Sequence, residues 1–173
     1  LMQSIVQVES LSLPKKLVHV IDREGDSVAH MRQMSQAGYQ WLVRCKEGNR
    51  VSIEGHASIR IGDVADQVTC CAIKAFQHQG IAVTLRVGET SIVVSRPAKP
   101  KQTNAQGQRV AVIAGEPIAA RLIVAELVNA DGVALTRWTL LSNVDREIDT
   151  QELAQWYYWR WSIESFFKLI KQA

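Results

Sequence analysis

The segment QELAQWYYWRWSIESFFKLIKQA, residues 151–173, holds seven of the eleven aromatic residues of the chain and is therefore built unlike the rest of it. At helical pitch, its polar side chains gather within about 60° of one side. These are Tyr157, Arg160, Glu164 and Lys171. The residues that fall opposite are Trp159, Ile163, Phe166, Phe167, Leu169 and Ile170. The pattern predicts an amphipathic helix that buries the apolar side and leaves the polar row open.

The polar row has two interpretations. In the first, it is an ordinary solvated helix face, stabilised by the i,i+4 pair Arg160 and Glu164. In the second, Glu164 is a carboxylate held among groups that bind phosphate, as in a metal-dependent phosphoryl-transfer site. The helix alone does not choose between them, so the rest of the chain must decide.

Size and composition set limits on the function. With 173 residues, 47% of them hydrophobic, the chain can form one globular domain with a real core. A net charge of +3 and a pI near 8.9 permit nucleic-acid binding without arguing strongly for it. Cys45, Cys70 and Cys71 form no metal or disulfide pattern, which predicts reduced, buried thiols in a cytoplasmic protein. No apolar run approaches the roughly 18 residues of a membrane span, so no membrane partner is expected.

Residues 17–45 predict a strand, a helix and a second strand. The apolar run LVHVI at 17–21 has the composition of a buried strand, and 39–45 has that of another. Asp26 or Ser27 can cap a helix over 28–37. Asp22 follows the first strand directly, at the kind of strand end where open α/β sheets place their sites. Its ordinary role there would be that of a turn former.

The middle of the chain lacks a helical period and predicts antiparallel strands. These are expected at 68–75, 81–87, 91–96, 109–113, 118–128 and 133–141, with hairpin turns at Gly88-Glu89 and, as a type I′ turn, at Asp131-Gly132. The stretch 97–109 has three basic residues and no acidic one, typical of a surface loop that is either merely solvated or touches DNA phosphates. Asp145, Asp149 or Thr150 can open the final helix. We therefore expect an α/β (α+β) fold made of residues 1–46, a β-rich insertion at 47–146 and a core helix at 147–173.

Asp22 and Glu164 are 142 residues apart, yet each suits a hard cation. Two carboxylates from different elements that hold Mg²⁺ are the centre of a two-metal phosphoryl-transfer site. Arg160, Lys171 and Tyr157 could then hold backbone phosphates by charge and hydrogen bonding.

The spacing Tyr157-x2-Arg160-x3-Glu164-x6-Lys171 resembles the signature of the insertion-sequence family four transposases, which belong to the DDE group of bacterial DNA transposases. The block VIDREGD at 20–26 resembles that family's second-aspartate motif. LVRCK at 42–46 resembles its next strand, whose arginine lies near bound DNA. The resemblance covers nearly the whole chain and implies a partial RNase H-like fold interrupted by a large antiparallel β insertion.

The resemblance implies that Asp22 and Glu164 are the second and third metal-binding carboxylates of a DDE triad. The reaction would be Mg²⁺-dependent strand cleavage and joining at transposon ends, with Mn²⁺ as a substitute. The family's pattern implies that the residues near the DNA are Tyr157, Arg160, Lys171, Arg44 and Trp138. The implied partners are transposon-end double-stranded DNA and a second copy of the chain in a synaptic complex, in the bacterial cytoplasm and on the nucleoid when bound.

For two residues within these motifs, the sequence leaves more than one role open. RWTLLS at 137–142 resembles the family segment whose tryptophan stacks on a flipped base, and stacking of that kind contributes about 1–3 kcal/mol per base. The alternative for Trp138 is a buried side chain in a strand. Asp26 is expected to cap or support the loop rather than to bind metal.

The chain departs from the family pattern at the first aspartate of the triad. Glu9 is the only acid before Asp22, so we expect the fragment to be inactive alone although its parent is a transposase. A non-catalytic DNA-binding or assembly remnant of a transposase is the alternative. A β-rich interaction domain without a nucleic-acid role is the third hypothesis.

Overall fold

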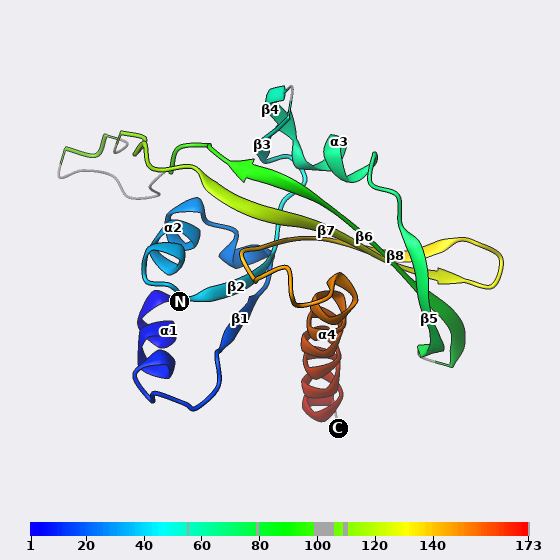
Figure 1. The fold of residues 1–173 in the computed structure, drawn as a ribbon. Helices are drawn as coiled ribbons and strands as arrows, with labels where there is room; N and C mark the ends of the chain where they lie inside the picture. Colours follow the sequence, from blue (N-terminus) through cyan, green and yellow to red (C-terminus); the bar gives the residue numbers. More distant parts are fainter. Residues whose placement is uncertain (55, 79, 99–105, 109–110, 173) are drawn as a thin grey trace.

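The chain forms a mixed α/β structure around one large, mostly antiparallel sheet (Figure 1). The computed structural model describes residues 1–54, 56–78, 80–98, 106–108 and 111–172; the side chains of 161, 162 and 164–172 lie outside that description. The helices are α1 (Met2–Glu9), the 3-10 helix η1 (Arg23–Gly25), α2 (Val28–Gln36), α3 (Ile61–Ala65) and α4 (Thr150–Gln172). The strands are β1 (Val18–Ile21), β2 (Gln40–Arg44), β3 (Arg50–Ile53), β4 (His56–Arg60), β5 (Cys71–His78), β6 (Ile81–Val94), β7 (Ile118–Asn129) and β8 (Ala134–Ser142).

The sheet has the strand order β1-β2-β8-β7-β6-β3-β4, with β5 also paired to β6. The β1–β2 pair is parallel, with Ile21 opposite Val43, and the other pairs are antiparallel. β8 lies directly beside β2, with Leu42 opposite Ser142. Strands of the predicted insertion therefore continue the same sheet as the predicted core, rather than forming a sheet apart from it.

Both faces of the sheet are buried where helices cover them. Leu42 and Val43 are neighbours in β2 and point to opposite faces, and both are fully buried. Val43 joins a cluster that includes Met31 and Met34 of α2, whereas Leu42 joins one that includes Leu153 of α4. Coverage on both faces explains why residues 41–43, Trp-Leu-Val, are a continuous apolar run instead of an alternating one.

The turn predicted at Gly88-Glu89 is wrong, because both residues lie inside the continuous strand β6 and Gly88 pairs with Val124. The two strands predicted around it are one. A Cβ on Gly88 would lie 2.4 Å from the carbonyl oxygen of Thr69. This glycine therefore permits a close approach of the segment before β5, which is the other common use of glycine in a strand.

The hairpin predicted around Asp131-Gly132 is confirmed, but its turn type is not. Type I′ needs positive φ at both central residues, and here Gly132 has φ +81° whereas Asp131 has no positive φ. Asn129 organises the loop, since its side-chain oxygen accepts from the backbone N–H groups of Asp131 and Val133. Sequence patterns also missed β3, β4 and α3. In the strand predicted at 109–113, of which 109–110 lie outside the described residues, Ile113 forms only an isolated bridge to Ala98.

Candidate functional site

Asp22 stands at the carboxyl end of β1, where its side chain caps η1. Its Oδ1 accepts a hydrogen bond from the backbone N–H of Arg23 at 2.7 Å. A Cβ on Gly25 would lie 2.2 Å from Cγ2 of Ile21, so only glycine lets the turn fold back this closely on the strand. The Asp22 side chain remains 31% exposed, which leaves the carboxylate accessible to a ligand.

Three other predicted site residues converge on this carboxylate. Tyr157 Oη donates to Asp22 Oδ1 at 2.9 Å across 135 residues of sequence. Arg160 Nη1 lies 3.7 Å from Asp22 Oδ2. Arg44, at the end of β2, places its Nη1 3.8 Å from Asp22 Oδ1. The parallel β1–β2 pair and α4 thus bring together a carboxylate, a phenol and two guanidinium groups.

At the α4 side chains that the structure describes, the predicted rotation of the helix is wrong. Tyr157 is fully buried, whereas Trp159 and Ile163 are 52% and 56% exposed. The side of the helix that carries Tyr157 faces the sheet, where its ring meets Trp138 edge-on with centroids 5.8 Å apart. A tyrosine can be buried when its hydroxyl finds an acceptor, and Asp22 supplies one. At these positions, the hydrophobicity of the helix therefore pointed to the wrong face.

The contacts of Asp22 and Tyr157 set opposite shifts in their pKa values. Burial by itself would raise the pKa of Asp22, but the Arg23 N–H, the Tyr157 hydroxyl and the charges of Arg160 and Arg44 together lower it. Burial and the hydrogen bond to Asp22 raise the pKa of Tyr157 to about 12. At neutral pH the site therefore holds an ionised carboxylate beside a protonated phenol.

An ionised, partly exposed carboxylate has the chemistry that Mg²⁺ and Mn²⁺ prefer. Asp22 supplies one such group, and within the described residues no three Asp, Glu, His or Cys side chains gather into a metal cluster. Glu164 and Lys171 lie in α4, but their side chains are outside the described part of the chain. The pairing of Asp22 with Glu164 and the role of Lys171 therefore stay predictions. Among the described residues of the site, Asp22 alone therefore has the chemistry of one ligand for such a cation.

Asp26 has the supporting role expected of it. Its side chain has no exposed surface. It accepts hydrogen bonds from the Lys46 backbone N–H at 2.7 Å, Asn49 Nδ2 at 2.6 Å and Arg96 Nη2 at 2.7 Å. Ser27, not Asp26, occupies the N-cap position of α2. The Asp26 carboxylate joins the loop after β1 to the turn after β2. These two segments directly follow Asp22 and Arg44 in the sequence.

Trp138 lies in β8 and is 1% exposed. Its ring packs against Tyr157 and Tyr158 of α4, with centroids 5.8 and 6.2 Å away. The structure thus has the buried strand tryptophan that was the alternative to base stacking. To stack on a base, this ring would have to leave its place beneath α4.

A buried polar cluster at the start of α4 escaped prediction from the sequence. Arg121 of β7 is only 5% exposed and bonds to Glu89 and Thr150, among other groups. The available signal was an arginine inside the apolar run of β7, a position where charge is rare unless it is paired. Of the predicted helix openers, Asp149 accepts from the Gln151 backbone N–H at 3.3 Å.

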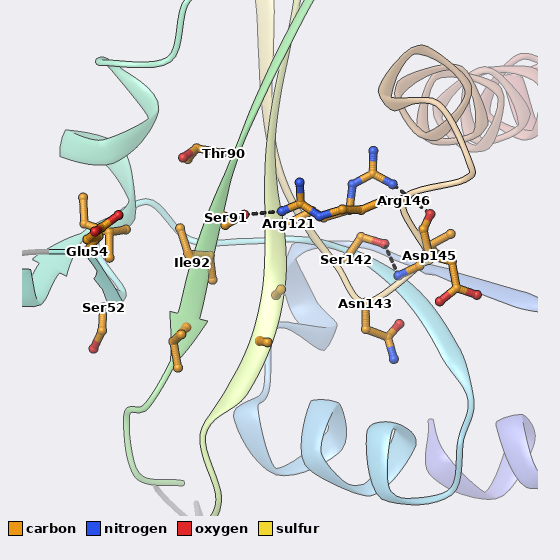
Figure 2. Close-up of a pocket in the computed structure, with 15 residues that line it drawn as sticks. Ser52, Glu54, Thr90, Ser91, Ile92, Arg121, Ser142, Asn143, Asp145 and Arg146 are labelled. Carbon is orange, nitrogen blue, oxygen red and sulfur yellow. Dashed lines mark hydrogen bonds between the residues drawn. The ribbon is translucent and has the colours of Figure 1, made fainter.

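A groove of about 830 Å³ lies beside this cluster, but it does not contain Asp22 (Figure 2). Its lining includes Ser91, Ser142, Asn143 and Arg146. These groups already have partners. Arg146 donates to Ser91, and Ser142 donates to the backbone carbonyl of Trp41. The Asn143 side chain accepts from the backbone N–H of Trp41 and donates to the backbone carbonyl of Tyr39. Because these four side chains already have partners and Asp22 lies elsewhere, the groove is not the candidate site.

Comparison with known proteins adds no assignment: no protein-family model matches the chain, and no curated protein does either. Among the residues that the structure describes, none of the helices combines the length and the apolar character needed to cross a membrane. The function is therefore inferred from the geometry around Asp22 and the motifs of the sequence.

Proposed function

We propose that this chain is part of the catalytic domain of a DNA transposase and contributes Asp22 to a Mg²⁺-dependent phosphoryl-transfer site. One observation carries the proposal. Asp22 meets Tyr157, Arg160 and Arg44, which come from distant parts of the sequence and are among the residues that the transposase motifs single out. The proposal includes a partial RNase H-like fold, with Asp22 after β1 and Glu164 on α4.

Each side chain has a distinct role in this proposal. A cation bound through Asp22 and Glu164, with Mn²⁺ able to replace Mg²⁺, supplies Lewis acidity for attack on a phosphodiester by water or a 3′-hydroxyl. Arg160 and Arg44 contribute positive charge beside the carboxylate, where phosphate oxygens would lie. Tyr157 holds Asp22 in place through its hydroxyl. Arg44 and Arg160 therefore serve both the carboxylate and the bound DNA backbone.

The proposed partner is the double-stranded DNA at a transposon end, bound by two copies of the chain. Phosphate contacts by arginine fix the register of a protein on DNA and make its affinity fall with salt. Replacing Arg160 or Arg44 with Gln should flatten the plot of log affinity against log salt by about 0.9 for each phosphate that the variant no longer binds. Arg146→Gln is the matched control, because Arg146 lines the groove that does not contain Asp22 and bonds to Ser91.

The test of the metal role measures the affinity for labelled duplex DNA from the ends of the encoding element, in EDTA and in Mg²⁺. We expect Mg²⁺ to strengthen binding by the unmodified chain. In Asp22→Asn that gain should disappear, while binding in EDTA is retained or improved because a negative charge beside the phosphates is gone. Asp66→Asn removes an exposed carboxylate that pairs with Arg137 instead, and should keep the gain.

An equal Mg²⁺ gain in Asp22→Asn and in the unmodified chain would contradict the metal role of Asp22. DNA binding that never responds to Mg²⁺ would favour the alternative, a non-catalytic DNA-binding or assembly remnant. Absence of DNA binding in all conditions would contradict both and leave a β-rich interaction domain.

A further inference from the structure

Arg121 occupies a position where a charge is costly. It lies in β7 between Ala120 and Leu122, and it is 5% exposed. A buried guanidinium is tolerated only if its donors are satisfied and its charge is paired. Its surroundings therefore show what the residue holds in place.

All five N–H donors of Arg121 have acceptors. Nε and Nη2 donate to Glu89 Oε2 at 2.8 and 2.6 Å, and Nη2 also donates to Thr150 Oγ1 at 3.0 Å. Nη1 donates to the backbone carbonyls of Asp145 and Ile148 at 3.1 and 2.8 Å. The Thr150 hydroxyl in turn donates to Glu89 Oε2 at 2.7 Å. Figure 2 shows Arg121 reaching from the sheet toward the loop that carries Asp145.

This cluster joins β6, β7 and the connection from β8 to α4, so it anchors the first residue of α4 to the sheet. Helical geometry then extends its effect along the helix. Seven residues turn a helix through about 700°, only about 20° short of two full turns. Tyr157 follows Thr150 by seven residues, so it lies on the same side, about 10 Å further along. Anchoring the Thr150 side to the sheet also turns Tyr157 toward the sheet.

We propose that Arg121, together with Glu89, is a positioning residue that sets the rotation of α4 and thereby brings Tyr157 and Arg160 to Asp22. The anchor explains why α4 exposes Trp159 and Ile163, against the hydrophobic pattern of the helix. The consequence for phosphoryl transfer rests on the function proposed above. The contact between Tyr157 and Asp22 can be measured without it.

The test is a double-mutant cycle on Asp22→Asn and Tyr157→Phe, read as urea unfolding, in the unmodified chain and in Arg121→Met. Two residues in direct contact give non-additive effects on stability, and residues out of contact give additive ones. We expect non-additivity in the unmodified chain and its loss in Arg121→Met. Equal non-additivity in both would overturn the proposal, whatever the total loss of stability.

Arg32→Met is the matched control, since Arg32 is also buried and also donates to two backbone carbonyls, those of Arg96 and Glu116. It should lose stability and keep the coupling between Asp22 and Tyr157. If Arg121→Met does not fold, Thr150→Val removes one hydroxyl from the same cluster at nearly constant shape. There too we expect reduced coupling, and undiminished coupling would overturn the proposal.

The Mg²⁺ gain in DNA affinity, measured on the same variants, separates this proposal from the proposed function. Loss of both coupling and Mg²⁺ gain in Arg121→Met, with both kept in Arg32→Met, supports the two together. Lost coupling in a chain that never shows a Mg²⁺ gain supports the positioning role while contradicting the metal site. A Mg²⁺ gain and a coupling that both survive Arg121→Met contradict the positioning role alone.

Discussion

The hydroxyl of Tyr157 donates a 2.9 Å hydrogen bond to the Asp22 carboxylate, and this bond joins the N-terminal part of α4 to the end of β1. Among the described side chains of α4 and β2, three contact Asp22, and this contact is the shortest. Because one partner is charged and the other is buried, the bond contributes to stability, to the ionisation of Asp22 and to the geometry of the candidate site.

Replacing Tyr157 with Phe removes this bond and keeps the ring that packs on Trp138. Hydrogen bonds to charged groups contribute about 1.5–3 kcal/mol, and partial exposure of Asp22 places the expected loss near the low end. Urea unfolding measures it. Tyr39→Phe is the control, because it also removes a tyrosine hydroxyl but leaves the bond between Tyr157 and Asp22 in place. The Tyr39→Phe variant should lose much less stability. Equal losses in the two variants would show that the bond to Asp22 is not what matters.

Stability should depend on Asp22 in acid. The pKa of Asp22 is lowered from 3.8 in the folded chain, so its contribution is fully present above that value and is lost as pH falls through the folded pKa. We expect the difference in unfolding free energy between the unmodified chain and Asp22→Asn to be constant above about pH 5 and to shrink in more acidic solution. A difference that grows toward low pH would contradict the assignment.

The phenol of Tyr157 should be recognisable by ultraviolet titration. Its pKa is raised to about 12, so one tyrosine should ionise well above the usual value of 10. Folding stability should fall between about pH 10 and pH 12, because the folded state holds this proton more tightly than the unfolded one. In Asp22→Asn the pKa should move down, since a negative charge and an acceptor are lost, yet stay above 10 because the ring is still buried.

Asp26→Asn should be among the most destabilising changes near the site. It removes the carboxylate, which is fully buried, from its pair with Arg96, which is only partly buried, and breaking a buried pair from one side costs about 3–5 kcal/mol. Asp66→Asn breaks the exposed pair with Arg137 and should remain within about 1 kcal/mol of the unmodified chain. Thermal and urea unfolding of the two variants give the comparison, and similar losses would contradict the structural role of Asp26.

Gly88→Ala tests the close approach that replaced the predicted turn. The added Cβ would meet the carbonyl oxygen of Thr69, a backbone atom that can yield only if β6 or the segment before β5 moves. Overpacking of this kind costs about 1–3 kcal/mol. Gly48→Ala is the matched control, because nothing lies within 4 Å of its added Cβ. If both variants keep full stability, β6 tolerates a side chain at this position, and close packing against Thr69 does not explain why residue 88 is glycine.

Much of the local structure could be predicted from the sequence. The strand–helix–strand unit appears as β1, α2 and β2, and the final helix begins at Thr150, three residues after the start of the segment expected at 147–173. Apolar runs, caps and glycines act over a few residues, so a linear pattern carries their effect. Gly88 was misread for the same reason: a glycine needed for a turn and one needed for close packing look alike until Thr69, nineteen residues earlier, is placed beside it.

The sequence by itself predicted the strand–helix–strand unit and the final helix, and it singled out four side chains that the structure brings together, namely Asp22, Arg44, Tyr157 and Arg160. Only the tertiary structure decided which side of α4 meets the sheet. That choice depends on Arg121 and Glu89, which lie 29 and 61 residues from Thr150, and on the fit of Tyr157 against Trp138. Amphipathicity measures how apolar each face of a helix is. In α4, the face that is buried is instead the one whose polar groups find partners. For α4 those partners lie on distant strands, so no periodicity within the helix could reveal them.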